Sequence, residues 1–243
     1  MLELPSLRRE TRYGMPAADQ IMFNRYFVIG YSYYFRQAKW ALEIVSRTKE
    51  GEGNVERLDN FRPDYRIPEI FRAELKDFER SGFDRGHLVA SANQRLTRIQ
   101  NSETFLLSNM SPQAPNLNRK TWRELEKAVR TLDAKDHILE TYVISGPIFD
   151  FDKPVQTIGK DDNVGVTLPI PHYYFKSVLA EDVRGNLRMW SFVLPNENSD
   201  KELEDFQIST SKVEVYAGLL LWERLTGTEI REEKDSVREM WER

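Results

Sequence analysis

Histidine is scarce in this sequence, and the segment around His87 is the clearest candidate for chemistry. The chain has 243 residues and three histidines, the other two being His137 and His172. Gly82 and Gly86 precede His87 and give the backbone freedom to approach a ligand. Arg85 lies two residues before His87, on the same side of an extended segment. Such a pair can hold a phosphate while the imidazole removes a proton from water. From these residues alone, a buried structural cluster is an equal alternative.

The other histidines and the absence of cysteine narrow the choice of chemistry. His137 opens an apolar segment and His172 lies in a turn flanked by prolines, so we expect both to be structural. The sequence contains no cysteine, which excludes disulfides, thiolate metal sites and a cysteine nucleophile. His87 is therefore the main candidate for a general base.

A second group of polar residues, from Asn109 to Glu126, has a spacing that suits a cation. If one helix runs through Asn118, that residue and Glu126 are about 2.2 turns apart and share a face within roughly 80°. An amide oxygen and a carboxylate suit a hard cation such as magnesium, which usually keeps several of its waters. The simpler interpretation of these residues alone is a surface helix in which Glu126 pairs with Arg130 or Arg123.

Apolar runs predict the elements that must position these residues. Strands are predicted within 26–44 (two strands, the second over 38–45) and at 88–92, 105–108, 137–145, 173–180 and 187–194. The polar stretch 49–68 contains two glycines and a proline and predicts a loop. Helices are predicted over 121–132 and 213–225. This order indicates an α+β protein with a central, mostly antiparallel sheet flanked by helices.

The start and end of these helices depend on local signals. The first has an apolar stripe made of Trp122, Leu125, Val129 and Leu132. Thr121 and Glu124 match a capping box, whereas Pro115 would open the helix earlier, and the sequence leaves both starts open. Gly227 is the expected C-cap of the second helix, and a charged helical tail is expected from Glu229 onward.

The charge is unevenly distributed along the chain. The net charge of −4 argues weakly against a polyanionic partner. However, residues 80–130 contain nine basic and four acidic side chains, a net charge of +5, which leaves −9 for the remainder. A basic segment in an acidic protein can still bind a phosphate backbone, and ordinary solvated charge is the alternative.

The sequence shows no repeat and no flexible linker, so we expect one domain over residues 1–243. Its first residues lack a basic region followed by an apolar run, and no apolar stretch approaches the roughly 20 residues of a membrane span. The expected location of the chain in this form is cytoplasmic, without a membrane partner. An exported or organellar precursor with a removed segment stays open.

The two polar segments together resemble a known family. FDRGH, followed by SETFLLSNMSPQAPNLNRKTWRELEKAVR, is similar to the DNA/RNA non-specific endonucleases of the ββα-metal type, which include endonuclease G, the Serratia nuclease and NucA-type enzymes. Upstream, Arg57 precedes an N-F-x-x-D stretch as in that family, and YVISGPIF and VEVYAGLLLWERLTG are similar downstream. The resemblance covers about residues 12–228 and leaves 229–243 as a charged tail. The spacing from the D-R-G-H motif to Glu126 is highly specific.

This resemblance implies roles for the matching residues. His87 would be the general base, and Asn118 the one direct protein ligand to Mg²⁺, with Mn²⁺ as a substitute. Glu126 would orient water on the metal. Arg57 and Arg85 would bind the phosphate and stabilise its charge in the transition state.

Three further residues have supporting roles in this interpretation. Asn109 matches an asparagine that supports the site by hydrogen bonding, and Asp84 is expected to fix its loop. Arg119, a peripheral member of the basic segment, is expected to contribute to substrate binding.

The implied activity is magnesium-dependent hydrolysis of DNA and RNA, with little sequence preference and with 5′-phosphate and 3′-hydroxyl ends. Because no export or mitochondrial signal is visible, the chain would need restraint as a regulated cytosolic effector, by a homodimer, a regulatory partner or an inhibitor. Two other classes are considered: an inactive nucleic-acid-binding pseudo-nuclease, and a phosphodiesterase for small nucleotides or lipids.

Overall fold

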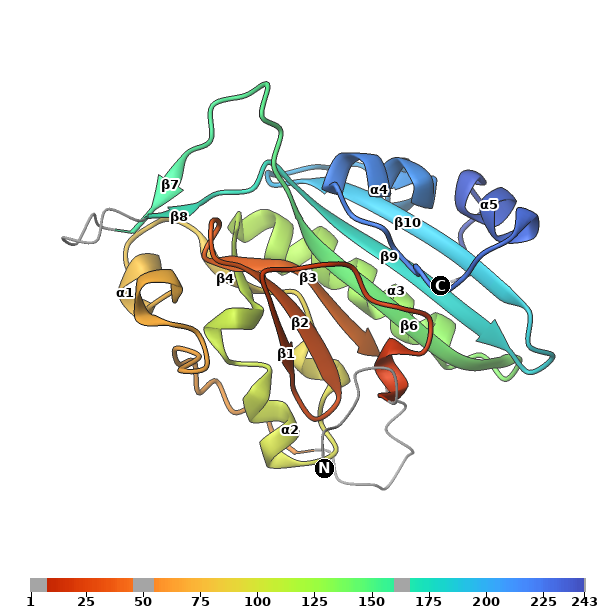
Figure 1. Ribbon diagram of the computed structural model, residues 1–243, viewed down its shortest axis with the longest axis horizontal. Coiled ribbons are helices and arrows are strands. Elements are labelled where there is room, and N and C mark those ends of the chain that lie inside the picture. Colours follow the sequence, from red (N-terminus) through yellow and green to blue (C-terminus); the bar gives the residue numbers. More distant parts are fainter. Residues whose placement is uncertain (1–7, 46–54, 160–166, 243) are drawn as a thin grey trace.

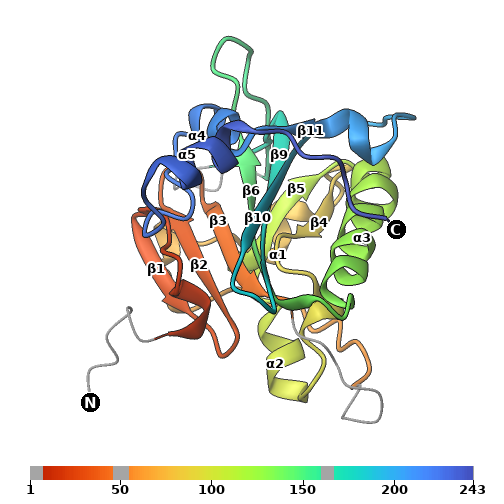
Figure 2. The same cartoon turned by 90° about the vertical axis from the view of Figure 1, so that its right-hand side faces the viewer.

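A seven-stranded antiparallel sheet forms the centre of the computed structural model, which describes residues 8–45, 55–159 and 167–242 (Figure 1). The fold is α+β, as the sequence predicts, and helices lie on both faces of the sheet (Figure 2). The strands at 26–44, 137–145, 173–180 and 187–194 form as expected. In spatial order the sheet consists of β1 (Gln20–Phe23), β2 (Phe27–Ser32), β3 (Gln37–Ile44), β6 (Ile138–Ile148), β9 (Tyr173–Asp182), β10 (Leu187–Pro195) and β11 (Gln207–Ile208).

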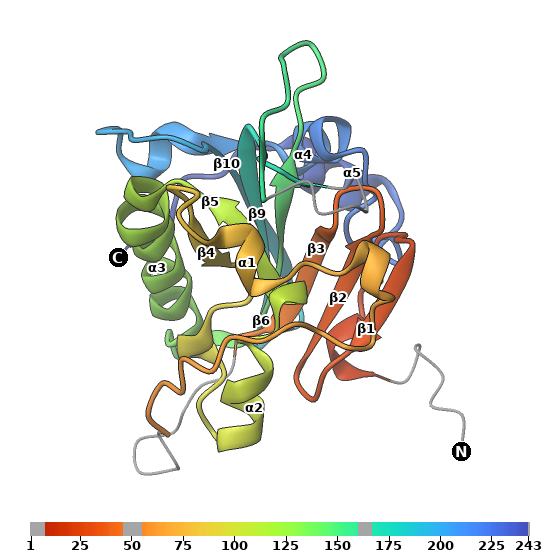
Figure 3. The same cartoon turned by 90° about the vertical axis from the view of Figure 1, so that its left-hand side faces the viewer.

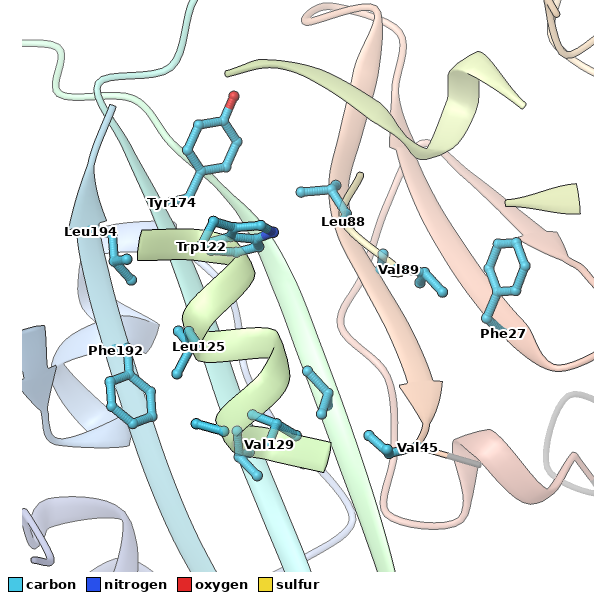
Figure 4. Packing of buried hydrophobic residues seen from close by; sticks show 14 of the residues in the cluster. Phe27, Val45, Leu88, Val89, Trp122, Leu125, Val129, Tyr174, Phe192 and Leu194 are labelled. Atoms are coloured by element: carbon cyan, nitrogen blue, oxygen red, sulfur yellow. The ribbon is translucent and has the colours of Figure 1, made fainter. Parts of the chain in front are cut away.

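The long helix on one face runs from residue 115 to residue 133 and begins with a wider turn. Residues Leu117–Trp122 are π-helical, and α3 (Arg123–Asp133) continues them without a break. The helix therefore begins at Pro115, where a missing amide hydrogen costs nothing in the first turn, and Thr121 is not its cap. The predicted apolar stripe is buried, as Figure 4 shows for Trp122, Leu125 and Val129.

Each face of the sheet carries its own hydrophobic core. On β3, Trp40 belongs to the core beneath α4 (Thr210–Ala217) and α5 (Thr228–Asp235). Ala41, the next residue, belongs to the opposite core, beneath α3. Successive side chains of a strand point to opposite faces, so a strand that is apolar throughout requires cover on both sides.

Two short strands lie outside the central sheet. β4 (Asp84–His87) pairs antiparallel with β5 (Met110–Gln113), which leads directly into the long helix. The strands predicted at 88–92 and 105–108 are wrong, because both ranges lie in the connection between β4 and β5. Their apolar residues are buried in turns. Pairing stops where the side-chain Oδ1 of Asn109 accepts the Val89 amide at 3.0 Å and replaces a strand partner.

Shorter elements complete the described part of the chain. The predicted loop is described from residue 55, and Arg62 pairs with Leu106 in an isolated bridge. Within the described ranges, no helix has the length and apolar character needed to cross a membrane. The short elements are α1 (Leu75–Phe78), α2 (Arg98–Glu103), the paired β7 (Thr157–Ile158) and β8 (Leu168–Pro169), and 3-10 turns at Arg9–Thr11, Glu69–Phe71, Ser91–Asn93, Leu107–Asn109 and Leu203–Phe206.

The C-terminal part differs from its predicted extent. α4 ends at Gly218, which has the left-handed φ of 62°, so the predicted helix to residue 225 stops early. Gly227 precedes α5 instead of ending α4. After α5 the chain crosses to the other face, where the Trp241 indole donates to the Ala128 carbonyl of α3 at 2.8 Å. The tail therefore packs on the long helix.

A close contact across β2 and β3 gives a test of the sheet. A Cβ built on Gly30 would lie 2.1 Å from Cε2 of the buried Trp40 ring. We expect Gly30→Ala to destabilise the protein by about 1–3 kcal/mol through overpacking. In a Gly30→Ala/Trp40→Phe double variant the loss should be smaller than the sum of the two single losses. Urea unfolding curves measure all three, and additive losses would contradict this packing.

Candidate active site

The β4–β5 hairpin and the helix that follows it form one unit on the α3 side of the sheet (Figure 3). Side-chain hydrogen bonds from Asn118, Arg119 and Trp122 join the helix to β4. The Asn118 Nδ2 donates to Asp84 Oδ2 at 2.9 Å, and the Trp122 indole donates to the His87 carbonyl at 3.2 Å. The first and last residues of β4 are therefore fixed to successive turns of the helix. This ββα arrangement brings the two polar segments of the sequence together.

His87 lies at the end of β4 in an aromatic surrounding. Its side chain is 9% exposed, and its ring meets the edges of Phe61 and Phe105 at centroid distances of 5.7 and 5.1 Å. The Nε2 atom is buried without a hydrogen-bond partner in the described structure. Burial, reinforced by the charges of Arg57 and Arg85, lowers the pKa of His87 to about 3. The imidazole is therefore neutral at physiological pH and able to accept a proton.

The same two rings hold the two arginines. The guanidinium carbon of Arg85 lies 4.1 Å from the centroid of Phe61, and that of Arg57 lies 4.9 Å from Phe105. Arg57 also donates to Asp59 Oδ1 at 2.7 Å and to Ser91 Oγ at 2.9 Å. Among the described residues, no acceptor or carboxylate pairs with the exposed guanidinium of Arg85, which is thus available to an anion.

Asn118 is oriented by the carboxylate beside it. Because its Nδ2 donates to Asp84, the amide oxygen points elsewhere, and no donor in the described part of the chain meets it. Arg119 binds both oxygens of Asp84, with distances of 2.8 and 2.6 Å. Although burial opposes this, hydrogen bonds from Arg119 and Asn118 lower the pKa of Asp84. Asp84 thus fixes an amide oxygen that can serve as a ligand to a hard cation.

The π-helical turns change the position of Asn118 relative to Glu126. A π turn closes through i→i+5 hydrogen bonds and so rotates less per residue than an α turn. The offset is therefore smaller than the roughly 80° that a regular helix would give.

Burial raises the pKa of the Glu126 carboxyl, against the opposing charges of Lys176 and Arg130. Within the described ranges, no group of three or more histidine, cysteine or acidic residues forms a metal cluster. A cation here would depend on the Asn118 oxygen, Glu126 and water.

Asn109 is buried behind His87 and acts on the backbone. Its Nδ2 donates to the carbonyls of Val89 and Thr104, both at 3.0 Å, while its Oδ1 accepts from Val89.

Gly86 has a role that the sequence did not suggest: a Cβ there would lie 2.1 Å from the Gln113 side chain. The second glycine of the motif therefore allows close packing within the hairpin.

The remaining histidines lie outside this group. His172 Nδ1 accepts the Asp150 amide at 3.1 Å, and its Nε2 lies 3.2 Å from the Pro154 carbonyl oxygen, so it braces a turn. His137 is exposed before β6. Sequence reasoning did not find Phe61 and Phe105, whose rings hold the site. The N-F-x-x-D stretch contains Phe61, but nothing in its pattern indicates contact with His87.

This site combines a buried neutral imidazole, the unpaired guanidinium of Arg85 and an oriented amide oxygen. These groups can accept a proton, bind a phosphate and bind a cation, which are the functions that a metal-assisted phosphodiester hydrolase requires. The comparisons define the class further. Residues 6–227 match the DNA/RNA non-specific endonuclease family. The chain belongs to this family and is a nuclease.

Named relatives and a solved structure agree with that membership. Mitochondrial endonuclease G of Caenorhabditis elegans is 35% identical over 227 residues, covering 88% of this chain and 71% of the relative. The human endonuclease G is 34% identical over 220 residues, covering 86% and 71%. Nuclease C1 of Cunninghamella echinulata is 30% identical over 234 residues, covering 91% and 90%. A chain in a crystal structure described as the EndoG/EndoGI complex superposes with a TM-score of 0.82 and 30% identity, covering 96% of both chains.

The burial of His87 predicts how stability depends on pH. The unfolded state takes up this proton below about pH 6.5, whereas the folded state takes it up only below about 3. Between these values the unfolded state binds more protons, so stability falls as pH falls. In His87→Phe this contribution is absent. From pH 7 to pH 4.5 we expect the wild type to lose about 2 kcal/mol more than the variant. Equal losses in denaturant titrations would contradict a buried neutral imidazole.

Proposed function

We propose that this nuclease hydrolyses phosphodiester bonds of DNA and RNA in a magnesium-dependent reaction with His87 as the general base. The observation that carries the proposal is the position of His87. Its neutral ring contacts Phe61 and Phe105, each of which also packs against an arginine. Its backbone carbonyl accepts a hydrogen bond from Trp122, on the helix that carries Asn118. Membership of the non-specific endonuclease family supports the substrate class. We infer 5′-phosphate and 3′-hydroxyl ends from the same family.

His87 would remove a proton from the attacking water. Burial is the main cause of its lowered pKa, and the charges of Arg57 and Arg85 add to it. A bound phosphate would neutralise the contribution of the two arginines, so substrate would make the imidazole a stronger base. A general base contributes roughly 10²–10⁴-fold to the rate when it is within reach of its proton.

The two arginines would serve the phosphate in different ways. The unpaired guanidinium of Arg85 is free to bind the phosphate oxygens and to stabilise the charge that develops on them. Arg57 is held by Asp59 and Ser91, so its charge approaches the site from a fixed direction. Arg119 is largely neutralised by Asp84, and its contribution to binding would be a peripheral one. Contacts of this kind are made to the backbone of the nucleic acid and carry little sequence preference.

The donor set fits a divalent cation of the magnesium type, with manganese as a substitute. Asn118 would bind it through the amide oxygen that Asp84 leaves free, and Glu126 would orient its water. A bound divalent cation supplies Lewis-acid stabilisation of phosphate charge. One solved relative is described in a complex that explains its inhibition, and we propose that a protein inhibitor is one means of restraining this chain.

The first test is cleavage of plasmid DNA and of structured RNA, each with magnesium and with chelator. The wild type should cut both substrates only when the metal is present. His87→Ala should reduce the rate by at least about a hundredfold because it removes the base. Its circular dichroism should stay native and its thermal unfolding cooperative, at a lower midpoint because a buried ring is lost. A folded His87→Ala protein that keeps more than about one hundredth of the rate would contradict the assignment.

A second test concerns the metal ligand. Asn118→Ala should lose activity mainly through weaker metal binding, and high magnesium or manganese should restore part of it. Cleavage rates are measured across a metal titration and compared with those of Arg123→Ala, an exposed residue on the same helix. If Asn118→Ala showed the metal dependence of the wild type, Asn118 would not be the ligand.

A further inference from the structure

Two charged side chains lie in the sheet beneath the catalytic helix, where apolar residues are expected. Glu43 of β3 is 1% exposed and Lys176 of β9 is 2% exposed. Side chains two residues apart on a strand point to the same face. Glu43 therefore shares the α3 face with Ala41, and Lys176 shares it with Val178, both members of that core. A single charge in an otherwise apolar strand is costly to bury unless other groups compensate it.

Lys176 has unusual surroundings for a buried ammonium group. Its Nζ donates to Ser145 Oγ at 2.7 Å and lies 4.3 Å from the centre of the Trp122 ring. No carboxylate oxygen in the described structure lies within ion-pair distance of Nζ. Burial lowers the pKa of Lys176, and the negative charges of Glu126 and Glu43 oppose this. The ammonium is therefore subject to the charges of two carboxylates, while its direct contacts are Ser145 and the Trp122 ring.

Glu43 connects this charge to the turn that follows His87. Its two oxygens accept from Asn93 Nδ2 at 3.0 Å and Gln94 Nε2 at 3.1 Å. Ser91, at the start of the same turn, accepts from Arg57. Burial raises the pKa of Glu43 to about 7, with Lys176 as the main opposing influence. Glu43 thus supplies a counter-charge for Lys176 and fixes the turn beside the site.

Lys176 also lies beneath the part of the helix that carries Glu126. Trp122, whose ring covers the ammonium, precedes Glu126 by four residues, so the two side chains share a helical face. Among the charges that act on the Glu126 carboxyl, that of Lys176 is the largest. Two arginines act on this carboxyl more weakly: Arg130, which follows it along the helix and binds Asn93, and Arg57 from the segment before β4.

We propose that Lys176, balanced by Glu43, is a positioning residue that acts through Glu126. Its fixed charge in the sheet attracts the Glu126 carboxylate and limits the orientations that this side chain adopts. The proposal rests on the role given to Glu126 under the proposed function. It assigns a catalytic reason to a buried pair of charges that well-packed apolar residues of similar size would replace together without loss of stability.

The test is a double-mutant cycle between Lys176→Met and Glu126→Gln, with kcat and KM for DNA cleavage at saturating magnesium. Each single variant should lower kcat by roughly 10–100-fold, as loss of supporting residues around a metal typically does, with little change in KM. If Lys176 acts through Glu126, the double variant should be no more than about threefold slower than Glu126→Gln alone. Losses that multiply would overturn the proposal.

Because Lys176→Met leaves two buried carboxylates without a cation, the cycle is repeated in a Glu43→Gln background, where the opposing charge is also removed. Thermal unfolding should show that Glu43→Gln/Lys176→Met regains stability relative to Lys176→Met. Its kcat should stay low relative to Glu43→Gln. Recovery of kcat together with stability would show a purely structural role and overturn the proposal.

Lys234→Met is the matched control. It removes a partly buried lysine that binds Glu214 at 2.7 Å on the opposite face of the sheet, and it should lower stability without changing kcat. The two proposals fail differently. If Glu126→Gln cuts as fast as wild type, the role of Glu126 in the proposed function is wrong. If Glu126→Gln is impaired and Lys176→Met is not, only the positioning role is wrong.

Discussion

The burial of an imidazole beside two guanidinium groups is the constraint around which this site is organised, because burial and the nearby positive charges both disfavour the protonated ring. Arg57 and Arg85 add positive charge next to His87, and burial removes the solvent that would screen it. The cost of this arrangement is limited because the imidazole stays neutral. Phe61 and Phe105 make the geometry stable, since each ring makes a T-shaped contact with the imidazole and offers a face to one guanidinium.

The helix and the β4–β5 hairpin contribute different atoms to the site. Asn118 and Glu126 on the helix offer oxygen atoms, whereas the hairpin offers nitrogen atoms. The hydrogen bonds of Asp84 and Trp122 join the two elements. The π-helical turns at Leu117–Trp122 bring Asn118 closer to the face of Glu126. Wide turns of this kind are less favourable than regular helix, and under the proposed function they would serve to bring the two oxygen donors toward one cation.

The central sheet gives this unit a rigid base. Residues 55–67 are fixed to the connection between β4 and β5, for example by the Ser108 hydroxyl, which donates to the buried Asp64 at 2.7 Å. Arg57 and Phe61 are thereby held close to His87 although they lie far from it in the sequence. Strands β3 and β9 add Glu43 and Lys176 from below, so the sheet contributes charge as well as apolar surface.

Local sequence determined much of this protein. The apolar runs predicted β2, β3, β6, β9 and β10 of the central sheet, though not the edge strands β1 and β11. The stripe through Trp122 and Leu125 predicted the helix, and the D-R-G-H motif with its downstream spacing indicated the family. These features depend on periodicity and on short-range spacing, which a sequence displays directly. The family resemblance, and not the spacing of Asn118 and Glu126 alone, favoured a cation site over a surface helix.

Tertiary structure decided what depends on contacts between distant residues. The end of the β4–β5 ladder was set by the Asn109 side chain, so the neighbouring apolar residues form buried turns where strands were expected. The aromatic support of His87 and the charges of Glu43 and Lys176 could not be predicted, because a lone phenylalanine or a lone charge in a strand has no local signature of its partner. Burial sets the pKa of His87 and the cost of each charge, and a hydrogen bond to Asp84, 34 residues away in the sequence, sets the orientation of Asn118. Both are properties of the packed chain.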